Sequence, residues 1–337
     1  MNRALYIVSP LYDWVFFLLP PMLSLALGIF LSGTNIASEN VHLFTEEDTL
    51  VGFALGTLVH AHLVAVFFRS HANREIFRLH PWRFVAVPLG LWALFVASLW
   101  CLIAATVVAT FWDVWHSGAQ TFGFARIYDR NQGTPPELGR RLDFWLNQLL
   151  YAGPILAGAT LMDHVESFDS FNDIGDLFFG AVPAAVEGRA RWLTVAVLVV
   201  GTLFLLFYLF AQVQFWRRGY RPSFEKIFLL TSTGFCSIYT WGWNSWGQAF
   251  LIMNTFHAVQ YLALVWAKER KNIQRVMRLP SSPRLAFALF FGSTVIYGFG
   301  VQALDTHLTI LWAVTIVVSL MHFWYDGFVW SVRRRQI

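Results

Sequence analysis

Four histidines in apolar segments share one position relative to the basic residues that follow them. His60, His116, His257 and His322 each precede a Lys or Arg cluster by about ten residues, which is roughly 15 Å along a helix. This shared offset predicts four imidazoles at one depth, near the middle of a lipid bilayer. Imidazole is a ligand of iron, zinc and copper in proteins, so these side chains are candidate metal ligands.

Three of the four histidines have a polar partner three or four residues away, on the same helical face. The pairs are His322 with Asp326, His116 with Gln120, and His257 with Asn254. A metal-bound histidine normally donates its other N–H to such a partner, which fixes the tautomer. We therefore expect Asp326 to be a fifth ligand or the orienting carboxylate. For Gln120, Asn254 and Gln260 we expect roles in holding the ligands or handling oxygen.

Spacing leaves two neighbouring residues open. His62 points to a different helical face from His60, so at most one of them is expected in the site, and depth favours His60. Asp113 lies one turn from His116 on nearly the same face and could be another ligand or its partner. A single buried histidine is more often a packing residue, but four at one depth favour a shared metal or cofactor site. The remaining histidines fall in loops or at interfaces: His42, His71, His80, His164 and His307.

The composition places these histidines in a membrane protein. The chain is 57% hydrophobic and 13% charged, against about 25% charged for an ordinary soluble domain. Its basic residues lie in short clusters between apolar runs, which indicates membrane topology rather than a nucleic-acid partner. Cys101 and Cys236 lie in apolar segments without a CxxC partner, so neither a disulfide framework nor a redox dithiol is expected.

The alternation of apolar spans with charged loops predicts an all-α bundle. We expect about ten transmembrane helices (eight to ten) in a single integral-membrane domain over residues 1–337, with both termini cytoplasmic. The stretch 84–125 would be roughly 60 Å long as one straight helix, so it should contain two. The predicted spans are 14–31, 51–68, two within 84–125, 144–161, 192–212, 227–239, 249–266, 285–302 and 308–330.

The loops of this topology carry opposite charges. Arg126, Arg130, Arg140 and Arg141 are expected in one cytoplasmic loop, and the residues from Lys268 to Arg278 in another. Residues 162–191 form the longest loop, which is acidic and is expected outside the cytoplasm, over the end of the bundle. We expect a multi-pass protein of a bacterial inner membrane, with the lipid bilayer as its surroundings.

No loop is long enough for a soluble catalytic domain, so the chemistry is expected inside the bundle. Imidazole with carboxylate and without thiolate suits non-haem iron, zinc or copper, and iron with open coordination positions is suited to oxygen chemistry. The HxxxH and HxxHH clusters of membrane di-iron desaturases and hydroxylases are absent from the sequence. A site at the bilayer midplane favours a lipophilic substrate that enters from the membrane.

The histidine stations resemble those of the Brp/Blh family of integral-membrane carotene dioxygenases. That family has His-Gly-x-x-Asp-His, His-Trp-Gly and His-x-x-Arg-His elements, and here 60–62, 116–118 and 257–261 occupy similar stations. Tyr261 stands where the last histidine would be, the aspartate of the first element is absent, and the His322 and Asp326 pair has no counterpart. The resemblance covers about the middle two thirds of the chain. It implies a multi-helix bundle whose intramembrane histidines hold iron, and it does not extend to the carotene substrate.

The leading hypothesis is a membrane-embedded non-haem iron oxygenase with His60, His116, His257, His322 and Asp326 at the metal. Such an enzyme could need an electron donor or partner subunit. One alternative is a haem-binding electron-transfer subunit, although two haems stacked across the membrane would place histidine pairs at two depths. The other is a transporter or membrane scaffold in which the polar layer joins helices or relays protons.

Overall fold

The computed structural model describes residues 5–43, 46–161, 189–279, 282–304 and 309–330. The predicted loop at 162–191 lies outside the described residues except for its last three positions. His164, His307 and the terminal arginines at 333–335 also lie outside them. The described chain is almost entirely helical, with one two-stranded antiparallel sheet. An all-α membrane bundle is therefore confirmed as the fold class.

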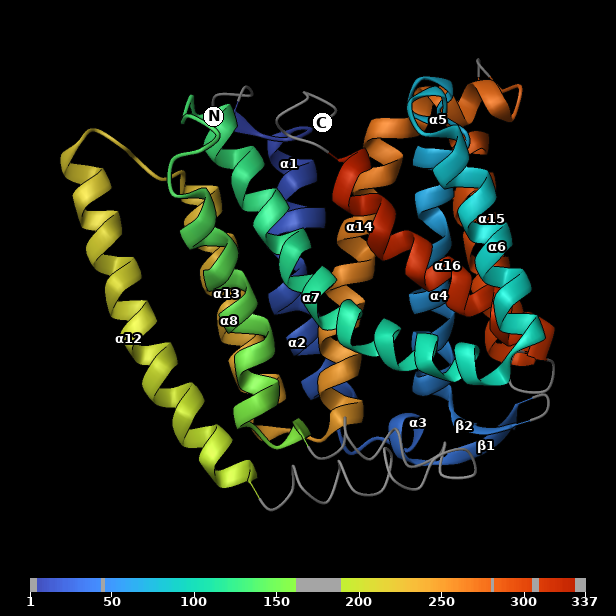
Figure 1. The fold of residues 1–337 in the computed structure, drawn as a ribbon, viewed down its shortest axis with the longest axis horizontal. Coiled ribbons are helices and arrows are strands. Elements are labelled where there is room, and N and C mark those ends of the chain that lie inside the picture. The colour runs from blue at the N-terminus through green and yellow to red at the C-terminus, as the bar shows by residue number, and fades with distance from the viewer. Residues whose placement is uncertain (1–4, 44–45, 162–188, 280–281, 305–308, 331–337) are drawn as a thin grey trace. The chain divides into compact units, whose positions relative to one another are not determined.

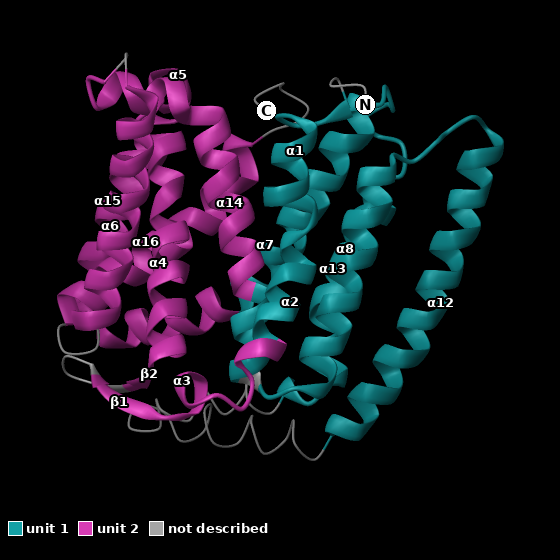
Figure 2. Cartoon of the chain, turned by 180° about the vertical axis from the view of Figure 1, so that it is seen from behind, with its two compact units in different colours: residues 1–28, 111–253 teal, residues 29–110, 254–337 magenta. Residues whose placement is uncertain are grey.

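The chain divides into two compact units that alternate along the sequence (Figure 2). Unit 1 contains residues 1–28 and 111–253, and unit 2 contains residues 29–110 and 254–337. Each unit therefore consists of two segments of the chain that are separated in the sequence by a segment of the other unit. Helices α7 (Leu99–Asn131) and α14 (Trp246–Val276) each contribute to both units.

Unit 1 is organised around α8 (Arg140–Ala157). This helix packs against α12 (Ala190–Arg217) and α13 (Phe224–Trp243), as Figure 1 shows. The N-terminal segment of the unit contains α1 (Pro10–Asp13), the π-helix η2 (Trp14–Leu18) and α2 (Pro20–Leu31). The helical stretch 10–18 is bent by 48° relative to α2. Helix α12 is the most apolar candidate span and only 11% of its window is buried, so most of its surface is available to lipid.

Unit 2 is organised around α4 (Leu50–Ser70), which packs along α15 (Pro283–Leu304) and α16 (Thr309–Val329). Gly298 makes the approach of α15 possible, because a Cβ there would collide with the Thr57 carbonyl oxygen of α4. Helix α6 (Pro81–Ala97) packs on α16, and the short α5 (Arg74–Leu79) connects α4 with α6. The remaining elements precede α4: α3 (Asn35–Ser38), β1 (Asn40–Leu43) and β2 (Glu46–Thr49).

Among the described residues, 6 helices are long and apolar enough to cross a membrane, or 7 if the bent N-terminal pair is one span. They are α4, α7, α12, α14, α15 and α16. The other predicted spans are also helices, but α6 is shorter and neither α8 nor α13 meets the same test of apolarity. The stretch 84–125 does contain two helices, separated at Ser98, whose backbone is extended.

The basic clusters correct the predicted loop boundaries. Arg126 and Arg130 lie on the last turns of α7, and Lys268 to Arg275 lie on α14 rather than in a loop. On α7, Arg126 pairs with the buried carboxylates of Asp129 and Asp143. Between the first two predicted spans, β1 and β2 pair as antiparallel strands.

Candidate metal centre

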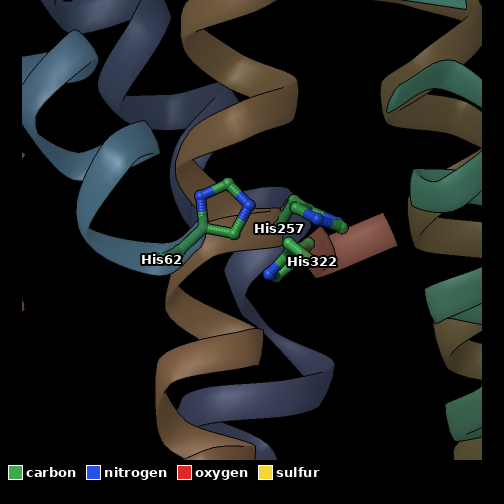
Figure 3. Close-up of side chains that lie close together, drawn as sticks. All are labelled: His62, His257 and His322. Atoms are coloured by element: carbon green, nitrogen blue, oxygen red, sulfur yellow. The ribbon is translucent and has the colours of Figure 1, made fainter. Parts of the chain in front are cut away.

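Three histidines of unit 2 converge from three helices (Figure 3). His62 comes from α4, His257 from α14 and His322 from α16. Each can offer a ring nitrogen such that the three atoms lie within 4.8 Å of one another. The ring of His62 lies 5.1 Å from each of the other two rings, nearly perpendicular to both. All three side chains are buried, with at most 1% of their surface exposed.

Helical periodicity explains how α4 presents His62. The buried residues in this part of α4 include Ala61, His62, Ala65, Val66 and Arg69. They recur at intervals of three, four and seven, so they form one face of the helix. The partner helices are the most enclosed of the candidate spans, with 72% of the α14 window and 61% of the α16 window buried. The polar side chains thus lie inside unit 2 and away from lipid.

Hydrogen bonding fixes the tautomer of His322. Its Nδ1 lies 3.0 Å from the carbonyl oxygen of Leu63 on α4. Because a carbonyl oxygen only accepts, Nδ1 must carry the proton and donate it. In the neutral ring Nε2 is then the acceptor nitrogen, and it lies 3.9 Å from Oδ2 of Asp326. The pairing of His322 with Asp326 that the four-residue spacing predicts is therefore present.

Two donors hold the carboxylate of Asp326 in place. The Tyr261 hydroxyl of α14 donates to Oδ1 at 2.8 Å, and the Trp330 indole N–H donates to the same oxygen at 2.9 Å. The Tyr261 ring also lies 4.5 Å from the His322 ring. With Oδ1 occupied in this way, Oδ2 is the oxygen directed toward His322.

This donor set fits a metal ion. Metal–imidazole bonds of about 2.0–2.1 Å place two ligand nitrogens roughly 3.0–3.4 Å apart, so small side-chain rotations would close the present arrangement. Neither ring nitrogen of His62 makes a hydrogen bond of acceptable geometry within the described part of the chain, and a buried polar atom without a partner is costly. Buried histidines that could hold a metal ion are therefore a feature of this fold.

The structure selects His62, and not His60, for the group that contains His257 and His322. The predicted depth of the two residues had favoured His60. Two residues differ by only about 3 Å in depth but by about 200° around the helix, so direction decides which ring meets the neighbouring helices. The sequence signal for this face is the spacing of seven residues between His62 and Arg69, which places both on one side of the helix. The structure shows that both are buried.

The other candidate residues are divided between the units. His116, Gln120 and Asp113 lie on the part of α7 that belongs to unit 1, where His116 is buried. Asn254 and Gln260 lie on α14 in unit 2 and are both buried. Their predicted roles at the metal stay predictions. Tyr261 and Trp330 were missed as partners of Asp326, although Tyr261 follows His257 by four residues and Trp330 follows Asp326 by four.

Unit 1 contains a buried ionic cluster that the sequence analysis did not anticipate. Lys226 Nζ lies 2.8 Å from Asp129 Oδ2 and 2.7 Å from Asp143 Oδ2. Arg126 contacts the same two oxygens at 2.9 and 2.7 Å. The hydroxyl of Tyr208 donates to Asp143 and that of Tyr220 to Asp129. The two positive and two negative charges balance, and the cluster ties α7, α8, α12 and α13 together.

The protonation of this cluster is held by its surroundings. Tyr220 lies in the connection between α12 and α13. Burial raises the pKa of Tyr220 to about 12, with Asp129 adding to the rise and Lys226 opposing it. Tyr220 therefore keeps its proton at neutral pH and remains a donor to Asp129. Because every charge is matched and hydrogen-bonded, we assign a structural role to the cluster.

No protein-family model matches the sequence, and neither a curated protein nor a solved structure matches it.

Proposed function

We propose that this protein is a membrane-embedded metalloenzyme, a non-haem iron oxygenase that acts on a lipophilic substrate. The observation that carries the proposal is the convergence of buried His62, His257 and His322 beside Asp326. An ionisable group inside a membrane helix is costly and is a functional-site candidate by default. A shared ligand accounts for three such imidazoles and a carboxylate together.

The donor set favours iron. Imidazole and carboxylate without thiolate is a ligand set typical of non-haem iron that keeps open coordination positions. Among the described residues, neither cysteine belongs to the group that His62, His257 and His322 form. When bound, iron would supply redox chemistry with dioxygen. The chain's own contribution is to hold three imidazoles and to orient Asp326.

The surroundings of the group favour an apolar substrate. Phe256 and Phe323, each next in sequence to a candidate ligand, are buried, as are Tyr261 and Tyr325. Such an apolar environment would suit a lipophilic substrate better than a water-soluble one. The resemblance to the Brp/Blh carotene dioxygenases supports the same class of mechanism, without identifying the substrate. We also infer a topology of about ten spans (eight to ten) with cytoplasmic termini in a bacterial inner membrane, and a reducing partner where the reaction consumes electrons.

The ring geometry argues against haem at this group. The ring of His62 meets those of His257 and His322 edge to face, at 5.1 Å in both pairs. Two imidazoles in such contact cannot both face a porphyrin plane between them. A mononuclear ion without a macrocycle fits the space better.

Elemental analysis with an absorption spectrum tests the proposal. The full chain would be purified in detergent without chelator as the wild type and as His257→Ala and His322→Ala. We expect near-stoichiometric iron without a Soret band in the wild type and loss of iron in both variants. A Soret band would assign the site to haem. Absence of metal even after iron loading would favour the transporter or scaffold alternative.

A further inference from the structure

A second polar group joins the same three helices that carry the histidines. Arg69 of α4 forms an ion pair with Glu269 of α14, and both side chains are buried. The Arg69 guanidinium also donates to the Val329 carbonyl oxygen at the end of α16, from Nε at 3.3 Å and from Nη2 at 3.1 Å. We call these three residues the helix clamp.

Each residue of the clamp follows the candidate ligand on its own helix by about two to three helical turns. Arg69 follows His62 by seven residues and Val329 follows His322 by seven, which is about two helical turns in each case. Glu269 follows His257 by twelve, a little over three turns. The three helices are thus joined at two levels, once by the histidines and once by the clamp. Two contacts at different levels fix both the spacing and the rotation of a helix, whereas one contact leaves it free to pivot.

The clamp is also connected directly to the carboxylate of the site. The Arg69 guanidinium lies over the Trp330 ring at 4.5 Å from its centroid, and Trp330 donates its indole N–H to Asp326. A chain of contacts therefore runs from Glu269 through Arg69 and Trp330 to Asp326 and His322. Movement of Arg69 would release the indole that holds Asp326 Oδ1.

Glu269 is built to keep the clamp rigid. The Asn73 side-chain amide donates to its Oε1 and Oε2 at 3.3 and 3.1 Å, and the Asn272 amide donates to Oε2 at 2.6 Å. The carboxylate therefore has partners on α4, on its own helix and at Asn73, which caps α5. Its geometry is determined on several sides, so the position of Arg69 is determined as well.

We propose that Arg69 and Glu269 are positioning residues of the metal centre, which set its ligand geometry and metal affinity by locking α4, α14 and α16. This inference rests on the proposed function, because it requires that the histidines bind a metal. Groups that hydrogen-bond the ligands of a metal site typically change its affinity by about 10–100-fold when they are removed. Arg69 acts one contact further out, through Trp330, so we expect its loss to weaken metal binding by about tenfold, the lower end of that range.

The test is Co²⁺ binding to the detergent-purified full chain, followed by visible absorption and by competition with a chromophoric chelator. Arg69→Met removes the clamp, and Arg69→Lys keeps the charge but loses the forked donation to Val329. The matched control is Lys226→Met, which removes a buried cation from two carboxylates in unit 1. We expect Arg69→Met to weaken Co²⁺ binding and alter the Co²⁺ spectrum, Arg69→Lys to be intermediate, and Lys226→Met to keep the wild-type affinity and spectrum.

Several outcomes would overturn the assignment. Arg69→Met with affinity within twofold of the wild type and an unchanged spectrum would show that the clamp does not position the ligands. An equal loss in Lys226→Met would show that general destabilisation is enough. If Arg69→Met fails to fold, Arg69→Lys and Glu269→Gln decide by the same two measurements. A wild type that binds neither Co²⁺ nor Fe²⁺ would overturn the metal centre itself, which separates that failure from a failure of the clamp.

Discussion

Replacing Lys226 by methionine should remove the centre of the unit 1 ionic cluster. The Nζ of Lys226 makes charge-assisted contacts with Asp129 and Asp143 and a hydrogen bond to Tyr220 at 3.0 Å. Only 3% of the Lys226 side chain is exposed. Methionine has a similar length and fills the same space, so the variant isolates the charge from the packing.

The magnitude follows from what Lys226→Met leaves behind. Asp129 and Asp143 are both fully buried, and they would share the single remaining cation of Arg126. Removing one partner of a buried ion pair typically costs about 3–5 kcal/mol, because the other charge is left without compensation. We therefore expect the free energy of unfolding to fall by about 3–5 kcal/mol. Arg221→Met is the control, because Arg221 is exposed and stacks on Trp216, and it should cost under about 1 kcal/mol.

A double variant separates charge imbalance from lost contacts. Lys226→Met with Asp143→Asn removes one charge of each sign and leaves the Arg126 and Asp129 pair. Its loss in free energy of unfolding should therefore be smaller than the sum of the losses in the two single variants. Residues in one network commonly show coupling of about 0.5–3 kcal/mol. The assay is reversible denaturation in detergent, followed by tryptophan fluorescence. A Lys226→Met loss below about 1 kcal/mol, or strictly additive single effects, would refute the assignment of a buried, mutually dependent cluster.

Three further variants test unit 2. His62→Ala should abolish metal binding in elemental analysis and His60→Ala should retain it, and the opposite result would return the site to the depth-based prediction. Gly298→Ala should lower the free energy of unfolding by about 1–3 kcal/mol, because its Cβ would meet the backbone of α4; Gly292→Ala, on the same helix with open space around it, should be neutral or slightly stabilising. Burial lowers the pKa of His71 in the folded protein, so the imidazole of the unfolded chain becomes protonated at a higher pH than that of the folded protein. The free energy of unfolding should therefore fall as the pH drops below about 6.5. The thermal midpoint of the wild type should then fall further between pH 7.5 and 5.5 than that of His71→Asn, and equal falls would contradict the reasoning.

The helices of this fold could be predicted closely from the sequence. Each apolar run between charged clusters became a helix, because inside a membrane the backbone must satisfy its own hydrogen bonds. The break within 84–125 also followed from length alone. The ends were less predictable, since Arg126 and Glu269 look like loop residues until their buried partners are known. Those partners come from segments far away in the sequence.

The candidate site was predictable in part. The pairing of His322 with Asp326 is local, four residues apart on one helix, and the sequence was sufficient for it. The choice between His60 and His62 depends on which face of α4 meets α14 and α16, and that face is set by packing between distant segments. Depth along α4 did not distinguish His60 from His62, whereas rotation about the helix axis decides which of them lies beside His257 and His322.

The alternation of the two units along the chain has a consequence for biogenesis. The helix that carries His62 leaves the ribosome early, and 195 residues separate it from His257. At about 5–20 residues per second, synthesis of that interval takes on the order of 10–40 s. During this time α4 stays in the membrane with His62 and Arg69 facing neither of their final partners, while most of unit 1 is made. A ligand shared by all three histidines could therefore bind only after α16 is made, and a nascent chain that ends before α14 would still lack the Glu269 carboxylate that pairs with Arg69.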